Sequence, residues 1–287
     1  MTSQAAPWSI RAASPTAEAG RSTIPLVNAH DPAVGKLLLL GEDYGEYGAI
    51  ASTIVGSRAA AAISVGSDPD SPSQQFKYDP NTSNEDALCV MEAGSWAGYA
   101  VADAHYGPES SHMLISRLHT IWSKIQPTDV NHLGQMIEFL RNGDLPTTES
   151  ETTLLVVVYD RATREGYGIS FGDSSFVIVG PGHSAEPINR RDGRYVTAAE
   201  RSSLLHGSAF RFQANHGDLL LTYTDGVDEC HYRQPKTSIR PAHVTAVATG
   251  AGLDPLATVD GLTRLALTGV DGNPGGQDNV AIIAAEA

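Results

Sequence analysis

Cysteine and basic residues are scarce in this chain of 287 residues, and each scarcity excludes a class of protein. The two cysteines, Cys89 and Cys230, lie far apart, so neither a disulfide framework nor a zinc-binding pattern is visible, and a reduced, cytoplasmic setting is expected. Lysine and arginine total 19 against 33 aspartate and glutamate residues, which gives a net charge of −14. Such an acidic chain is not expected to bind nucleic acid or an anionic membrane.

Long hydrophobic runs are also missing. The longest, such as residues 37–40 and 154–159, are far shorter than a membrane-spanning helix requires, so no transmembrane segment is predicted. The first 33 residues are rich in Ala, Ser, Thr and Pro without periodicity, and they lack the apolar core of a secretion signal. We therefore predict a flexible extension over residues 1–33 and one domain over residues 34–287, whose core is ample because 41% of the residues are hydrophobic.

Acidic residues recur where apolar runs begin or end. The run from Tyr99 to Ala102 is typical of a strand buried on both faces, and Asp103 follows it directly. Taken alone, an Asp close to a glycine is an ordinary turn residue. Three further acidic signatures border apolar runs, at residues 84–86, 224–226 and 277–279. Because four carboxylate groups stand at the ends of expected strands, the sequence predicts one shared cation site.

Periodicity and turn residues predict blocks of strands separated by pairs of helices. Strands are expected over residues 87–91, 96–102, 152–160, 167–171, 175–179, 218–224 and 279–285, with two more between residues 49 and 65. Helices are expected over residues 108–125, 129–143, 241–248 and 255–267. The three strands within 152–179 are expected to form a meander, and residues 180–213 to be irregular. This order favours an α+β fold, a four-layer αββα sandwich with two antiparallel β-sheets flanked by helix pairs.

Six short motifs in this order resemble those of the PPM (type 2C) metal-dependent Ser/Thr protein phosphatases. They cover about two thirds of the chain: Asn-Glu-Asp-Ala at 84–87, Ala-Asp-Ala-His at 102–105, Glu-Thr-Thr at 151–153, Gly-Asp-Ser at 172–174, Thr-Asp-Gly at 224–226 and Gln-Asp-Asn-Val at 277–280. The resemblance implies a signalling phosphatase that removes phosphate from serine or threonine of a phosphoprotein. The attacking group would be a hydroxide shared by two Mg²⁺ or Mn²⁺ ions.

The resemblance also implies a role for each matching residue. Asp103 would bridge both ions, Glu85 and the Ala104 carbonyl would bind one of them, and Asp225 and Asp278 the other. Carboxylate oxygens are the ligands that these hard cations prefer.

Three more residues match the family outside this set of ligands. Asp86 would support the water molecules on the metals, Asp173 would bind a weaker third ion, and His105 would act as general acid on the leaving alkoxide. A positioned general acid contributes about 10²- to 10⁴-fold in rate.

The sequence departs from the family pattern in a few places. Asn81 stands where relatives acting on phosphoproteins often carry a phosphate-binding arginine, and Lys77 is the candidate replacement. Ala104 replaces a usual glycine, and a positive φ there would be strained. The short distance from Asp173 to Asp225 predicts a reduced flap region. An alternative is therefore a catalytically weak relative that binds a phosphoprotein or regulatory partner. The oligomeric state and the choice between Mg²⁺ and Mn²⁺ are left open.

Overall fold

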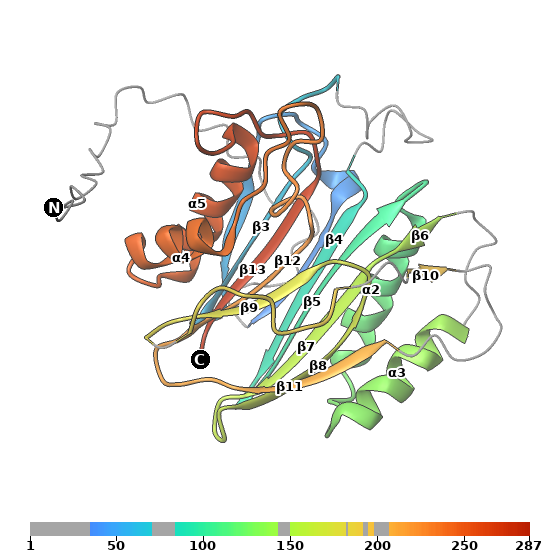
Figure 1. The fold of residues 1–287 in the computed structure, drawn as a ribbon. Helices are drawn as coiled ribbons and strands as arrows, with labels where there is room; N and C mark the ends of the chain where they lie inside the picture. The colour runs from blue at the N-terminus through green and yellow to red at the C-terminus, as the bar shows by residue number, and fades with distance from the viewer. Residues whose placement is uncertain (1–34, 71–83, 143–149, 182, 192–194, 198–206) are drawn as a thin grey trace, which may run out of the picture.

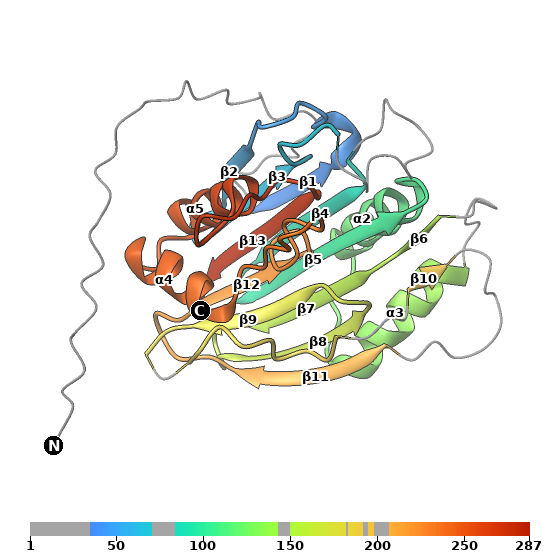
Figure 2. The same cartoon turned by 45° about the horizontal axis from the view of Figure 1, so that its top comes forward.

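Two β-sheets pack face to face, and each carries a pair of helices on its outer side (Figures 1 and 2). The structure is a computed structural model, and it describes residues 35–70, 84–142, 150–181, 183–191, 195–197 and 207–287. The expected extension over residues 1–33, and both Lys77 and Asn81, lie outside these described residues. The α+β fold with a four-layer αββα sandwich is confirmed.

The first sheet contains, in the described residues, eight strands in the order β1-β4-β5-β7-β8-β11, with β6 paired to the end of β5 and β10 paired to β6. All of its neighbouring pairs are antiparallel. Its strands are β1 (Lys36–Leu40), β4 (Asp86–Ala93), β5 (Trp96–His105), β6 (Glu151–Thr152), β7 (Leu154–Asp160), β8 (Glu165–Phe171), β10 (Val196–Thr197) and β11 (Ser208–Gln213).

The second sheet contains five described strands in the order β2-β3-β13-β12-β9, again all antiparallel. These strands are β2 (Ala51–Val55), β3 (Ala59–Ser64), β9 (Ser175–Val179), β12 (Leu219–Tyr223) and β13 (Val280–Glu286). A short 3-10 helix, η2 (Gly41–Asp43), follows β1. The helices are α2 (Glu109–Trp122), α3 (Val130–Asn142), α4 (Pro241–Gly250) and α5 (Pro255–Thr268). No helix in the described part of the chain is both long and apolar enough to cross a membrane.

Local sequence signals explain where the helices begin. The Asp129 carboxylate accepts hydrogen bonds from the backbone N–H groups of Asn131 (2.8 Å) and His132 (2.9 Å), as an N-terminal cap does. Asp254 caps α5 in the same way through the N–H of Ala257 at 2.7 Å. Proline at the first position of α4 and α5 suits both helix starts, because the missing N–H would have no partner there.

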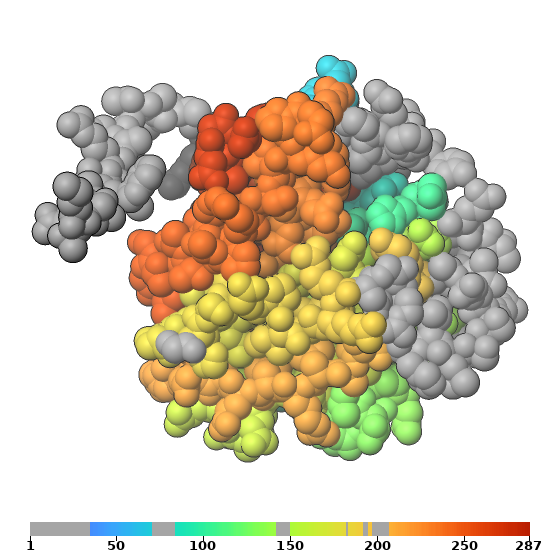
Figure 3. Space-filling model, viewed as in Figure 1, coloured from blue at the N-terminus to red at the C-terminus, as the bar shows by residue number. Residues whose placement is uncertain are grey.

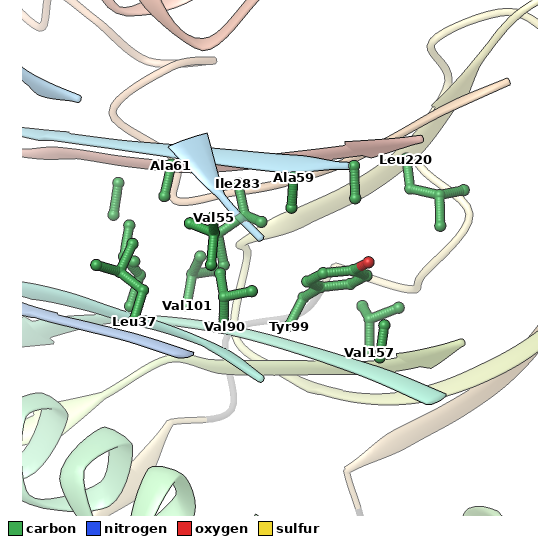
Figure 4. Packing of buried hydrophobic residues seen from close by; sticks show 14 of the residues in the cluster. Leu37, Val55, Ala59, Ala61, Val90, Tyr99, Val101, Val157, Leu220 and Ile283 are labelled. Atoms are coloured by element: carbon green, nitrogen blue, oxygen red, sulfur yellow. The ribbon is translucent and has the colours of Figure 1, made fainter. Parts of the chain in front are cut away.

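The core has three layers because the central strands bury both faces. Alternate residues of β4 point in opposite directions, so Leu88 and Val90 pack between the two sheets while Cys89 and Met91 pack under α2 and α3. Figure 4 shows the layer between the sheets, where Tyr99 and its neighbours meet side chains of the second sheet. A third layer lies between the second sheet and the pair α4 and α5.

Three sequence expectations about strands were wrong or incomplete. The hairpin of β7 and β8 forms as predicted, but β9 leaves it after the turn at Gly172 (φ 84°) and pairs with β12 in the second sheet, so the meander stops at two strands. The segment expected to be irregular contains β11, in which Phe210 and Phe212 pack against the core and the alternate residues Ala209, Arg211 and Gln213 face solvent. Strand β1 was not predicted either.

Candidate functional site

The hairpin of β4 and β5 brings the first two acidic motifs together. Asp86 and Asp103 are directly opposite in the antiparallel register. The Asp103 backbone is held from the other side, because its N–H donates to Thr153 Oγ1 (3.0 Å) and its carbonyl accepts from the Thr153 N–H (2.8 Å) and the Thr152 hydroxyl (3.0 Å). The Asp103 carboxylate therefore leaves the end of β5 from a fixed backbone position.

Glu85 is buried, with 3% of its surface exposed, and it joins three segments. Its Oε1 accepts a hydrogen bond from the Gly107 N–H at 2.9 Å. Its own N–H donates to Asn279 Oδ1 at 2.8 Å, and its carbonyl accepts from the Ser111 hydroxyl. The first motif is thus tied to the closing motif at 277–280 and to the start of α2.

The second sheet supplies two further acids. Asp225 follows β12 and Asp278 precedes β13, and these two strands are hydrogen-bonded neighbours. A Cβ atom at Gly226 would lie 1.8 Å from the Asn279 carbonyl oxygen and 3.3 Å from Asp278 Cβ, so only glycine allows the two turns to approach this closely. Thr224 links the sheets, because its hydroxyl donates to Asp86 Oδ2 at 2.8 Å.

Electrostatics show that the acids of the two sheets meet. Burial raises the pKa of Asp225 well above its ordinary value, and the carboxylates of Asp103, Asp278 and Asp173 raise it further. Asp173 stands in the turn between β8 and β9, whose Ser174 hydroxyl hydrogen-bonds Thr153 Oγ1 at 2.9 Å. Four carboxylates from both sheets therefore converge on one region, where like charges repel one another.

The donor set fits a divalent cation. Asp173 Oδ1 and Asp225 Oδ1 are buried and accept no hydrogen bond from the described residues. Buried carboxylate oxygens without donors beside further carboxylates are what a hard cation would satisfy. No three of the described His, Cys, Asp or Glu side chains stand close enough to hold one ion as they are placed here. The fit to a cation therefore rests on the two buried oxygens without donors and on the carboxylates around them.

Two aromatic residues border the acids, and sequence analysis missed both. The Tyr232 hydroxyl donates a hydrogen bond to Asp278 Oδ2, and the Tyr232 N–H donates to Gln277 Oε1 at 2.8 Å. Tyr195 packs edge-on against His105, with ring centroids 5.0 Å apart. Neither tyrosine lies in a periodic segment or a recognisable motif, so no sequence signal pointed to them.

His105 ends β5 at the rim of the acidic cluster. Its Nδ1 lies 3.9 Å from Glu151 Oε1, and 42% of its side chain is exposed. Ala104 lies inside β5 and is not among the described residues with positive φ, so the strain that a positive φ would bring does not arise. The chain instead turns at Tyr106 (φ 62°) and Gly107 (φ 119°).

The predicted site residues thus gather at one end of the sandwich. In the space-filling view, atoms of the segment after β12 (orange) and of the β4–β5 region (turquoise) reach the surface on the same face (Figure 3). Lys77 lies outside the described residues.

Comparison with known proteins assigns the fold. The model of the family described as stage II sporulation protein E (SpoIIE) matches residues 109–287, more than half of the chain. This chain belongs to the SpoIIE family. The predicted PPM (type 2C) resemblance is confirmed by this match and by the solved structures that share the fold. The comparison with curated proteins gave no match.

Three solved structures share the fold of this SpoIIE-family chain, and two of them are phosphatases. A bacterial serine phosphatase bearing an R161A mutation is 17% identical (TM-score 0.59), and the match covers 79% of this chain and 97% of that one. The catalytic domain of the serine/threonine phosphatase PstP, with two manganese ions, is 19% identical (TM-score 0.57; 80% and 97% covered). RsbX in complex with magnesium is 10% identical (TM-score 0.53; 83% and 100% covered). At these identities the structures show a shared fold.

Proposed function

We propose that this chain is a metal-dependent phosphoprotein phosphatase that hydrolyses phosphoserine or phosphothreonine. The observation that carries the proposal is the meeting of Asp103, Asp225, Asp278 and Asp173 from both sheets, two of them with buried oxygens that lack donors. The family and the phosphatase fold support the same assignment. Clustered acids without cations of their own make a poor binding site for a phosphate dianion, so the substrate requires metal ions.

We propose the following ligands for two Mg²⁺ or Mn²⁺ ions and a weaker third. Asp103 serves both principal ions, Glu85 and the Ala104 carbonyl serve one, Asp225 and Asp278 serve the other, and Asp173 serves the third. When bound, the ions would activate water as a nucleophile and neutralise the phosphoryl charge.

Two other residues would hold water in place and transfer a proton. Asp86 is fixed by Thr224 and lies opposite Asp103, which suits a role in holding water near the ions. His105 stands at the rim with Glu151 beside its Nδ1, where it would give a proton to the leaving alkoxide. A serine or threonine alkoxide is a poor leaving group, so this proton transfer lowers the barrier.

The test is turnover of p-nitrophenyl phosphate and of a phosphoserine peptide with Mn²⁺, followed by a chelator. We expect activity that the chelator abolishes, and we expect Asp103→Asn to lose both turnover and tight Mn²⁺ binding by calorimetry. Asp260→Asn on α5 is the matched control and should behave as the parent protein. Mn²⁺ binding without turnover of either substrate would instead favour the catalytically weak relative that binds a phosphoprotein.

A further inference from the structure

Tyr195 is brought to the acidic cluster by a three-strand ladder at the end of the first sheet. In this ladder Ala104 pairs with Thr152, and Thr152 pairs with Val196. Tyr195 comes immediately before Val196, so it lies one row closer to Asp103 (Figure 1 shows β6 and β10 beside the end of β5). Two hydrogen-bonded strands therefore fix the position of its backbone.

The side chain of Tyr195 faces the cluster. Its ring meets the His105 ring edge-on, with an interplanar angle of 81°. Burial raises the pKa of the Tyr195 phenol, and the carboxylates of Asp173, Asp225, Asp103 and Glu151 raise it further. A phenol with the ordinary pKa of about 10 already keeps its proton at neutral pH, and this shift acts in the same direction.

The Tyr195 hydroxyl can donate a hydrogen bond, which the ionised side chains of this cluster cannot. Ionised carboxylates accept hydrogen bonds and donate none. The Tyr232 hydroxyl donates to Asp278, and the hydroxyls of Thr153 and Ser174 bond each other. Among the described residues the Tyr195 hydroxyl has no such partner, and the residue is half-buried with its ring against that of His105.

We propose that the Tyr195 hydroxyl donates a hydrogen bond to a phosphoryl oxygen of the substrate. The inference rests on the proposed function, since it assumes that a phosphate group enters this cluster. A phosphoryl oxygen carries negative charge and is a strong acceptor, so a neutral donor adds attraction where the surrounding side chains would otherwise repel it. This contact is present in both the bound substrate and bound inorganic phosphate, so it contributes to binding more than to the chemical step.

The test compares Tyr195→Phe with the parent protein in the presence of saturating Mn²⁺. We expect the KM for p-nitrophenyl phosphate to rise by about tenfold while kcat changes little, the pattern that follows when a contact made equally in ground and transition state is lost. The inhibition constant of inorganic phosphate should rise in parallel. Mn²⁺ affinity and melting temperature should stay unchanged, because the substitution removes one oxygen at the rim.

Tyr106→Phe is the matched control. The Tyr106 ring also contacts His105, with centroids 6.4 Å apart, but 51% of the residue is exposed and it lies outside the ladder. Equal effects of the two substitutions, or unchanged KM and phosphate inhibition in Tyr195→Phe, would overturn the inference. A fall in kcat alone would also overturn it, since Tyr195 would then act through His105. If the parent protein shows no turnover, the proposed function fails by itself, and calorimetric titration of inorganic phosphate into both Mn²⁺-loaded proteins still decides the role of Tyr195.

Discussion

Gly226→Ala is the substitution whose effect the structure specifies most directly. The new Cβ atom would stand 1.8 Å from the Asn279 carbonyl oxygen, whereas real contacts of this kind are essentially never shorter than 3.0 Å. A backbone oxygen cannot rotate aside as a flexible side chain does. The turn at residues 225–226 must therefore move away from residues 278–279 by about 1 Å or more, which separates Asp225 from Asp278.

The expected cost has two parts. Overpacking at a tight contact typically costs about 1–3 kcal/mol of the free energy of unfolding. For a domain of this size that lowers the melting temperature by about 2–10 °C. A displacement of about 1 Å among reacting groups can cost on the order of 10²-fold in rate. We therefore expect weaker Mn²⁺ binding and at least a tenfold fall in kcat/KM.

Differential scanning calorimetry measures the loss of stability, Mn²⁺ titration calorimetry measures the loss of affinity, and turnover of p-nitrophenyl phosphate measures the fall in kcat/KM. Gly250→Ala is the control, because a Cβ atom at the end of α4 meets nothing within 4 Å and alanine favours a helix. It should leave the melting temperature unchanged or slightly higher. If Gly226→Ala matched the parent protein in melting temperature and Mn²⁺ affinity, the close approach of the two acidic turns would be refuted.

Two further substitutions probe the site without its ions. Because burial and repulsion by neighbouring carboxylates raise the pKa of Asp225, the folded state holds that proton more tightly, and metal-free stability should fall as pH rises from its ordinary pKa of 3.8 through the raised value. Asp225→Asn removes this loss, so without metal its melting temperature at pH 7 should exceed that of the parent protein. With Mn²⁺ the parent protein should have the higher melting temperature. A metal-free Asp225→Asn protein that melts below the parent would contradict the repulsion between Asp225 and its neighbouring carboxylates. Thr224→Val keeps the side-chain shape but removes the donor to buried Asp86 and the acceptor of the Ala281 N–H (2.9 Å), and should cost about 1–3 kcal/mol in urea unfolding. An unchanged unfolding midpoint would show that the bond between the sheets contributes nothing.

The acidic half of the site could be predicted because its signals are local. An apolar run that ends on Asp103, or one that begins after Asp278, shows a strand and its end without reference to any other segment. Only two residues separate β4 from β5, and their antiparallel pairing then places Asp86 opposite Asp103. The ends of these strands follow from periodicity and turn residues, which can be seen in a single sequence.

The rest depended on contacts between distant segments. Nothing near residues 172–174 indicates that β9 changes sheet, since a short glycine turn usually makes a hairpin; its partner β12 begins 40 residues later. The alternation of Phe210 and Phe212 is typical of a strand, but it spans few residues and lies in a polar segment, so it did not lead to the prediction of β11. Tyr195 reaches the acids only through pairing of β10 with β6, and a two-residue strand has no detectable period.

The linkage between the two sheets at the site has a consequence for folding kinetics. The bond from Thr224 to Asp86 joins residues 138 apart in sequence, and that from Glu85 to Asn279 joins residues 194 apart. Contacts with such separations form late, after both sheets have assembled, because the intervening chain must first be ordered. If the proposed ions bind across this seam, they would stabilise the native state more than the transition state. They would therefore slow unfolding and leave the refolding rate nearly unchanged, so that metal loading sets the lifetime of the folded domain rather than the speed of its formation.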